Sequence, residues 1–243
     1  MVIRLGTSGW TYDDWAGRFY PREVKQRDRL EYYATRFDTV ELNASFYRWP
    51  SDTTFAGWHD RLPARFAMTV KGPRSLTHAR RLRDPERWNE IMTRSLGRLG
   101  DRRGPLLLQL PPDLERDDDR LDRVLAVLPR DLRVAVELRH TSWLADEVLA
   151  LLERHAAAYV VMSGAGLQQE LRVTAPFVYV RWHGPDPDHL YRGSYDDAAL
   201  EGWAGHIRSW TRDGRDVYGY FNNDQRAYAP TNALRLKEML GQG

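Results

Sequence analysis

The chain has 243 residues, of which 42% are hydrophobic and 29% are charged, and its formal net charge is +2. This composition is typical of a globular protein with one sizeable core, and the nearly balanced charge does not by itself indicate nucleic acid. The absence of cysteine excludes disulfides, thiol nucleophiles and thiolate metal sites. No apolar run reaches the roughly 20 residues of a membrane helix, and the N-terminus shows no signal-peptide core, so we expect a cytoplasmic protein.

Strand-like runs follow one another along the chain, and most are separated by a helix-like stretch. They cover residues 3–9, 39–45, 65–71, 105–110, 133–139, 158–162, 177–183 and 216–222. Several of them alternate between aliphatic and polar residues, whereas the strands of a doubly wound open sheet read as continuous apolar runs. The pattern therefore predicts the α/β class, with a closed, parallel, eight-stranded (β/α)8 TIM barrel that occupies residues 1–243 as a single domain.

Helix start signals support the alternation of strands and helices. Asp84 is a candidate N-cap before Pro85, and Ser142 precedes the apolar run that starts at Trp143. Asp196 precedes an amphipathic stretch, and Pro230 opens the final predicted helix.

The seventh strand-like run, residues 177–183, has the most unusual pattern. Tyr179, Arg181 and His183 share one face of this strand, whereas valines and a tryptophan share the other. A buried strand has no need of charged residues, and a solvated strand would not carry large apolar residues opposite them. The alternation favours a strand whose polar face ends in a functional site.

In TIM barrels the chemistry lies at the C-terminal ends of the strands. Polar residues recur at these ends, and in several strands, such as those with Glu41 and Asn43 or Arg181 and His183, a shared parity places them inside the barrel. The candidate site residues at the strand ends are Trp10, Glu41, Asn43, Lys71, Gln109, Glu137, Arg139, Arg181, His183, Asn222 and Asn223. The alternative is a structural network of ion pairs, such as Glu41 with Lys71. Because buried ion pairs contribute little net stability, we favour a functional site.

The cations of this set indicate an anionic ligand. Arginine binds carboxylate or phosphate with a planar fork, and lysine supplies a point charge. We expect Lys71, Arg139 and Arg181 to hold the anion, with His78 on the following loop. Barrels often bind phosphate with the loops after strands seven and eight. These loops add the candidate ligand-binding residues Tyr191, Tyr195, Asn222 and Asn223.

Four residues are the catalytic candidates. Glu41 and Glu137 are the general acid/base candidates, and the pKa of a histidine such as His183 lies nearest to neutrality. Lys71 also leaves open a Schiff-base role, which would require a depressed pKa. Two glutamates could also suggest a glycosidase, but neighbouring arginines hold both ionised and argue against an acid partner.

No cluster with metal-ligand spacing occurs in the sequence, and no cofactor is evident, although a single Mg²⁺ carried by Glu41 or Glu137 stays open. We therefore expect an enzyme that binds a phosphorylated or otherwise anionic sugar or nucleotide. One alternative is a nucleic-acid-binding or phosphodiester-cleaving protein that uses a basic and aromatic rim with Arg80 and Arg81. A non-catalytic ligand-binding barrel is a third.

Short motifs extend along the whole chain. They are GTSGWTYDDWAGRFYP at 6–21, VELNASFYRWPS at 40–51, VKGPRSLTH at 70–78, LLLQLPP at 106–112, AVELRHTSW at 135–143, YVRWHG at 179–184, YRGSY at 191–195 and YFNND at 220–224. In these motifs the chain resembles the YecE-like family, catalogued as domain of unknown function 72. The resemblance implies a TIM-barrel fold and no particular reaction. The family pattern leads us to expect glycine at position 227, where this chain has Ala227.

Overall fold

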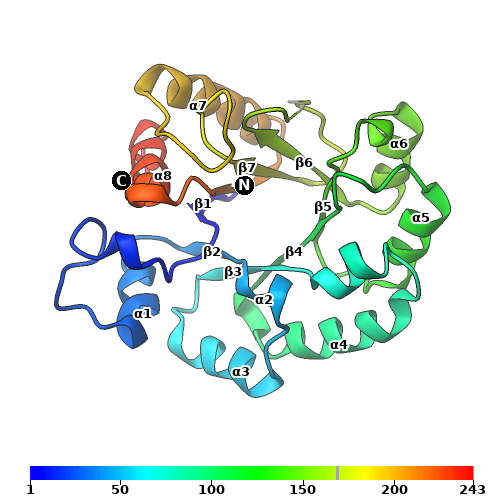
Figure 1. The fold of residues 1–243 in the computed structure, drawn as a ribbon, viewed down its shortest axis with the longest axis horizontal. Coiled ribbons are helices and arrows are strands. Elements are labelled where there is room, and N and C mark those ends of the chain that lie inside the picture. The colour runs from blue at the N-terminus through cyan, green and yellow to red at the C-terminus, as the bar shows by residue number, and fades with distance from the viewer. Residues whose placement is uncertain (168–169, 243) are drawn as a thin grey trace. The chain divides into compact units, whose positions relative to one another are not determined.

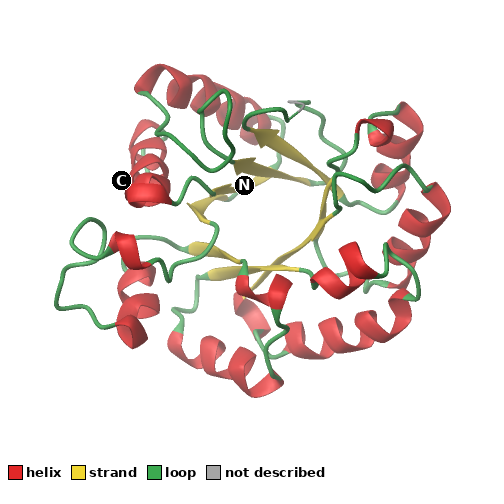
Figure 2. Cartoon of the chain, viewed as in Figure 1, coloured by secondary structure: helices red, strands yellow, loops and turns green. Residues whose placement is uncertain are grey.

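A computed structural model describes residues 1–167 and 170–242. Within these residues, eight strands form one sheet in the order β1-β8-β7-β6-β5-β4-β3-β2. A parallel bridge between Ser8 and Glu41 also joins the end of β1 to β2. The predicted (β/α)8 TIM-barrel fold is confirmed, because parallel strands form a nearly closed sheet with helices between them (Figure 2).

The strands follow the predicted runs closely. They are β1 Ile3–Thr7, β2 Thr39–Leu42, β3 Ala67–Lys71, β4 Arg103–Gln109, β5 Val134–Glu137, β6 Ala158–Ser163, β7 Phe177–Trp182 and β8 Asp216–Phe221. The predicted strand over 39–45 is too long, because Asn43 already has helical dihedral angles (φ −89°, ψ −27°) and a short helix follows it. The run over 133–139 likewise ends as a strand at Glu137.

Longer helices connect the strands, and short helical turns precede several of them. The helices are α1 Arg29–Ala34, α2 Ala44–Tyr47, α3 Asp52–Arg61, α4 Pro85–Gly97, α5 Asp118–Val127, α6 Asp146–Arg154, α7 Asp197–Arg212 and α8 Tyr228–Met239. The turns are η1 Asp13–Trp15, η2 Gln26–Asp28, η3 Ser75–Ala79, η4 Gly100–Arg102, η5 Thr141–Trp143 and η6 Gln225–Ala227. Among the described residues, no helix has both the length and the apolar character needed to cross a membrane.

The predicted helix starts are confirmed in part. The Asp196 side chain caps α7 by accepting a hydrogen bond of 2.8 Å from the Ala199 amide, and Pro85 is the first residue of α4. The prediction that Asp84 is an N-cap is wrong. This residue lies in the left-handed region, with φ of 50°, and makes no capping bond.

The other two start predictions are off by a few residues. Ser142 lies within the short turn η5, and the helix proper, α6, begins only at Asp146. The last helix, α8, begins at Tyr228 rather than at Pro230. Proline is tolerated in the first turn because the amide groups there have no partner within the helix, so it marks the first turn rather than the first residue.

The chain divides into two compact units, which we describe separately. The first unit comprises residues 1–41, 161–171 and 176–243, and the second comprises residues 42–160 and 172–175. In the first unit β8 pairs with both β1 and β7, and α7 packs beside α8 (Figure 1). In the second unit β4 pairs with β3 and β5, and α4 packs beside α5 (Figure 1). The single-domain organisation stays a prediction.

Strand β7 has the two faces that its sequence predicts. Tyr179 and Arg181 both bond the carboxylate of Glu41. On the opposite face, the Trp182 ring stacks on Phe221 of β8 at 4.4 Å and meets Trp203 of α7 edge-on. The apolar face of this strand therefore packs against a helix, and its polar face contributes to a cluster of charged and hydroxyl groups.

Ala227 has a backbone conformation that glycine adopts more readily. Its φ is +59° and that of Arg226 is +57°, so two successive side-chain-bearing residues lie in the left-handed region. This conformation is disfavoured for L-residues because of the Cβ atom. The expectation of glycine at this position therefore agrees with the path of the loop.

Candidate functional site

The first unit gathers six polar side chains at the ends of its strands. We call them the Glu41 cluster: Ser8, Tyr12, Glu41, Tyr179, Arg181 and Asp224. Ser8 and Tyr12 follow β1, Glu41 belongs to β2, Tyr179 and Arg181 belong to β7, and Asp224 follows β8. Parallel strands bring their carboxyl ends to the same edge of a sheet, which is why residues so distant in sequence meet here.

Glu41 has a donor on each of its carboxylate oxygens. Tyr179 donates to Oε2 at 2.6 Å, and Arg181 Nη2 donates to Oε1 at 2.7 Å. The Ser8 hydroxyl also donates to Oε1. Glu41 is fully buried and Arg181 is 1% exposed. A carboxylate held by this set of donors is suited to fixing the position of Arg181, and it is a poor candidate for taking a proton from a ligand.

The titration of Asp224 is strongly affected by its surroundings. Burial raises the pKa of its carboxyl group to about 7, and the negative charges of Glu41 and Asp14 act in the same direction. A hydrogen bond from Tyr12 and the charge of Arg181 oppose this increase. Burial and the neighbouring Asp224 also raise the pKa of Tyr12. Asp224 is thus a carboxyl group that titrates near neutral pH.

His183 is fully buried at the end of β7. Its Nδ1 lies 3.1 Å from Asn222 Nδ2, which can only donate, so this contact places the imidazole proton on Nε2. The ring of Tyr191 meets the imidazole edge-on, with 5.5 Å between ring centroids. Two predicted ligand-binding residues thereby hold this candidate catalytic histidine in one orientation.

Asn223 and Tyr195 belong to a network that ties loops to α8. Asn223 Nδ2 donates to the Gly193 carbonyl and to Asn232 Oδ1, each at 2.9 Å. Asn232 in turn receives the main-chain N–H of Tyr195. The pKa of the Tyr195 hydroxyl is raised to about 12 by burial. These contacts fix the loops, so a structural role accounts for the side chains of both predicted residues.

The loop after β7, which was predicted as a phosphate-binding loop, contains Gly184. Gly184 has φ of +97°, and a Cβ atom there would lie 2.1 Å from the Arg192 carbonyl oxygen. Close backbone approach therefore explains this glycine without a ligand. A hollow of about 430 Å³ lies beside the loop within the first unit, lined in part by Ser163, Tyr195, Trp203 and His206.

The second unit holds a separate basic group, which we call the Lys71 cluster: Lys71, Arg74, His78, Glu137 and Arg139. Lys71 is 7% exposed, and its ammonium lies 4.3 Å from the centre of the Phe46 ring. The His78 imidazole packs edge-on against the same ring at 4.9 Å. Arg139 Nε donates to Glu137 Oε1, and both side chains are buried.

The pKa of His78 reports the charge around it. Burial lowers this pKa, and the positive charges of Lys71, Arg74 and Arg139 lower it further, whereas the charge of Asp113 raises it. His78 is therefore neutral at pH 7, and three cations contribute a positive potential at its ring. A positive potential of this kind is suited to an anion.

The remaining predicted residues are Gln109, Asn43 and Trp10. Gln109 is the register partner of Glu137, so the two are neighbours on β4 and β5. Asn43 precedes α2, and its Oδ1 is buried without a hydrogen bond among the described residues. The carbonyl of Trp10 accepts a bond of 2.6 Å from the Tyr20 hydroxyl. This contact fixes the backbone of Trp10 in the first unit.

The structure thus distributes the predicted site residues over two units. Glu41, Arg181, His183, Tyr191, Tyr195, Asn222, Asn223 and Trp10 lie in the first, and Lys71, His78, Glu137, Arg139, Gln109 and Asn43 lie in the second. Sequence reasoning missed Ser8, Tyr12, Tyr179 and Asp224 as site residues. Tyr179 could have been found, because it shares its strand face with Arg181. Tyr12 lies in a loop, where no period signals its direction.

A metal ion has little support from the donor set. Within residues 1–167 and 170–242, no group of three or more histidine, cysteine, aspartate or glutamate side chains is arranged to hold one. The carboxylate oxygens of Glu41, which would be the first ligands of a Mg²⁺ ion there, already accept bonds from Arg181, Tyr179 and Ser8.

Comparison with known proteins places this geometry in a family. YunF of Bacillus subtilis, a UPF0759 protein, is 26% identical over 272 residues, covering 98% of this chain and 95% of YunF. The UPF0759 protein YecE of Escherichia coli K12 is 28% identical over 146 residues, which are 59% of this chain and 51% of YecE.

Solved structures agree on the fold. A DUF72 family protein of Thermotoga maritima, TM1631, has a TM-score of 0.90 and 29% identity, covering 99% of this chain and 100% of that one. The structure named SacUVDE has a TM-score of 0.62 at 9% identity over the full length of both chains, which indicates a shared fold alone. The family model for the protein of unknown function DUF72 matches residues 4–243, and the chain belongs to this family.

Proposed function

We propose that the chain is an enzyme for a phosphorylated or otherwise anionic small molecule, and that the Lys71 cluster of the second unit binds the anion. The observation that carries this proposal is the positive potential at His78, to which Lys71, Arg74 and Arg139 all contribute. Lysine and arginine side chains that are nearly fully buried are costly to desolvate, and a bound anion offsets that cost.

Each residue of the cluster has a role in this proposal. Lys71 is a compact charge held over the Phe46 ring, and Arg139 is oriented by its bond to Glu137. Together they suit the spread charge of a phosphate or carboxylate group. His78 is the proton-transfer candidate, because it is neutral at pH 7 and gains affinity for a proton when an anion arrives. Glu137 then serves to position Arg139.

Binding of inorganic phosphate tests the proposal, with lysine variants as a matched pair. Lys71→Met removes the ammonium over Phe46, and Lys237→Met removes another ammonium that lies 5.6 Å from the ring of Phe37 in the first unit. Isothermal titration calorimetry should show phosphate affinity at least about tenfold lower for Lys71→Met, a loss of about 1.4 kcal/mol, and unchanged for Lys237→Met. Equal affinities in the two variants would contradict the proposal.

The histidine supplies a second measurement on the unmodified protein. An NMR titration of the His78 ring should show its pKa below the ordinary value in chloride and higher in phosphate, since a bound anion stabilises the imidazolium form. Thermal-shift screening against phosphorylated sugars and nucleotides then selects substrates for turnover assays. An unchanged His78 titration in phosphate would show that the anion binds elsewhere.

Nucleic-acid binding has weaker support from this unit. Of the rim residues, Arg80 is exposed and Arg81 is half-buried, but Arg80 pairs with Asp84 at 3.2 Å and Arg81 pairs with Asp113. Cations with carboxylate partners release fewer counterions on meeting a phosphate backbone, and that release drives such binding.

A further inference from the structure

We propose that Asp224 and Tyr12, in the first unit, form a binding site for a primary ammonium group of a small ligand, which donates a hydrogen bond to Asp224 Oδ1. The proposal concerns the first unit alone and does not rest on anion binding by the Lys71 cluster. It uses a carboxyl group to which neither the family nor the proposed function gives a role.

The geometry around Asp224 leaves one acceptor open. Asp224 Oδ1 is buried and has no hydrogen-bond partner among the described residues. The backbone is held in place, because Trp15 Nε1 donates to the Asp224 carbonyl at 2.8 Å. A buried acceptor without a donor costs free energy, so a site built this rigidly around one suits a donor that arrives with a ligand.

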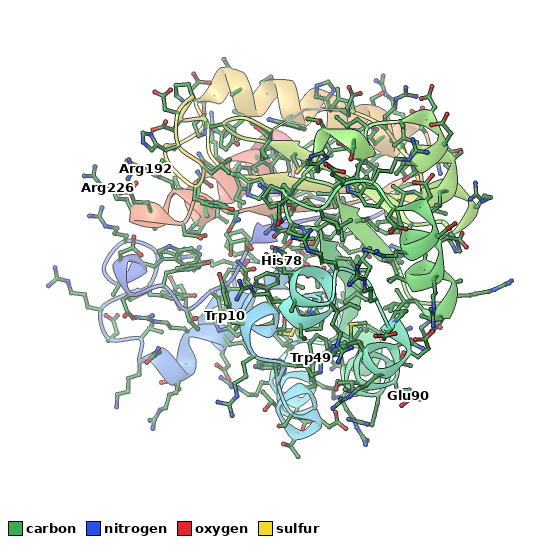
Figure 3. All side chains as sticks on the ribbon, turned by 45° about the vertical axis from the view of Figure 1, so that its right-hand side comes forward. Trp10, Trp49, His78, Glu90, Arg192 and Arg226 are labelled. Carbon is green, nitrogen blue, oxygen red and sulfur yellow. The ribbon has the colours of Figure 1, made fainter. Side chains whose placement is uncertain are left out.

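Tyr12 satisfies Asp224 only in part. Its single hydroxyl hydrogen also serves the Ser8 carbonyl, at 2.6 Å. Tyr12 and Asp224 each keep part of their surface accessible to solvent, so a small group can reach them. Arg226, two residues after Asp224, is exposed, and its side chain is labelled in Figure 3.

The charges around the carboxyl specify a cation. The groups that face Asp224 are Tyr12 after β1, Asp14 of η1, Glu41 of β2 and Arg181 of β7. With Asp224 ionised, three carboxylates stand against one guanidinium, so an added positive charge is favourable. The described residues offer no group of three metal-ligating side chains here or elsewhere, which favours an organic ammonium over a metal ion.

Binding of an ammonium ion is coupled to the loss of the proton from the Asp224 carboxyl group. Asp224 holds a proton below pH 7 and must lose it before it can pair with an ammonium ion. Binding therefore releases that proton to solvent, and the affinity for the ammonium ion should fall about tenfold for each pH unit below 7. Above pH 7 the affinity should be constant until the amine itself loses its proton.

The test follows the Asp224 carboxyl of the full chain by ¹³C NMR, with the signal assigned in the unmodified protein through its backbone connectivities. Titrations are run in equal concentrations of potassium chloride, methylammonium chloride and tetramethylammonium chloride. Methylammonium carries N–H donors, whereas tetramethylammonium has the same charge and none. We expect a midpoint of about 7 in potassium chloride, a lower midpoint in methylammonium and no comparable shift in tetramethylammonium.

Equal midpoints in the three salts, or equal shifts by the two ammonium ions, would overturn the proposal. Tyr12→Phe and Tyr20→Phe give a matched comparison, because both hydroxyls donate to a backbone carbonyl of this unit. Only the Tyr12 hydroxyl contacts Asp224, so Tyr12→Phe should raise the midpoint in potassium chloride and Tyr20→Phe should leave it unchanged.

Discussion

Each unit of the chain contains one buried glutamate–arginine pair, and the two pairs are built differently. In the first unit, Glu41 and Arg181 are 140 residues apart, and both side chains are almost fully buried. The hydroxyl groups of Tyr179 and Ser8 donate further hydrogen bonds to the Glu41 carboxylate. In the second unit, Glu137 and Arg139 are two residues apart on one strand end, and the arginine side chain remains 8% exposed.

This difference indicates which arginine is held in one position and which arginine can change its partners when a ligand binds. A carboxylate with donors on both oxygens holds its arginine in one place, and rearrangement would leave several buried groups unsatisfied. In the pair at the end of β5, the side chain of Arg139 keeps some contact with solvent and lies in the same charged cluster as Lys71 and His78, so this is the pair that we expect to respond to a ligand. Three substitutions measure this contrast, and we take them from the largest expected effect to the smallest.

Glu41→Gln should lower the free energy of unfolding by about 3–5 kcal/mol, because it leaves Arg181 buried without its counter-charge. Urea unfolding at pH 7 measures the change. Glu23→Gln is the control, since Glu23 is an exposed glutamate of the same unit, and it should stay within about 0.5 kcal/mol of the unmodified protein. If both substitutions have the same small effect on the free energy of unfolding, Arg181 does not depend on Glu41 for its position.

Asp224→Asn should stabilise the protein at high pH. The folded state raises the pKa of this acid from 3.8 to about 7, so folding favours its protonated form. Stability is therefore lost as pH rises from about 4 to 7, by up to roughly 4 kcal/mol, and less to the extent that solvent reaches the carboxyl. The variant cannot ionise, so its advantage should be present at pH 8 and absent near pH 4 in urea unfolding. Asp213→Asn, which replaces an exposed aspartate of the same unit, is the control.

Glu137→Gln should cost less than Glu41→Gln, about 1–3 kcal/mol, because the side chain of Arg139 retains more contact with solvent (8%) than that of Arg181 (1%). Urea unfolding at pH 7 again measures the change in the free energy of unfolding. A cost equal to that of Glu41→Gln would mean that the exposure of the arginine does not distinguish the two pairs.

Much of the fold could be predicted from the sequence because its signals are local. The two-residue period of residues 177–183 separates Arg181 from Trp182, and the structure places Arg181 against Glu41 and Trp182 under α7. Asp196 caps its helix as the pattern predicts. The boundary after Leu42 was missed, because the apolar and polar alternation continues through Asn43 into a helix.

The sequence by itself determined the barrel class and the parity of the polar faces, since the alternation of strands with helices and the two-residue period within a strand are both local signals. Only the tertiary structure decided the partner of Glu41, for which neighbouring-strand reasoning suggested Lys71 and which Arg181 bonds instead. It also decided that Asp224 titrates near pH 7. Partner choice and pKa depend on burial and on charges brought close from distant segments, and neither quantity has a local signature in the chain.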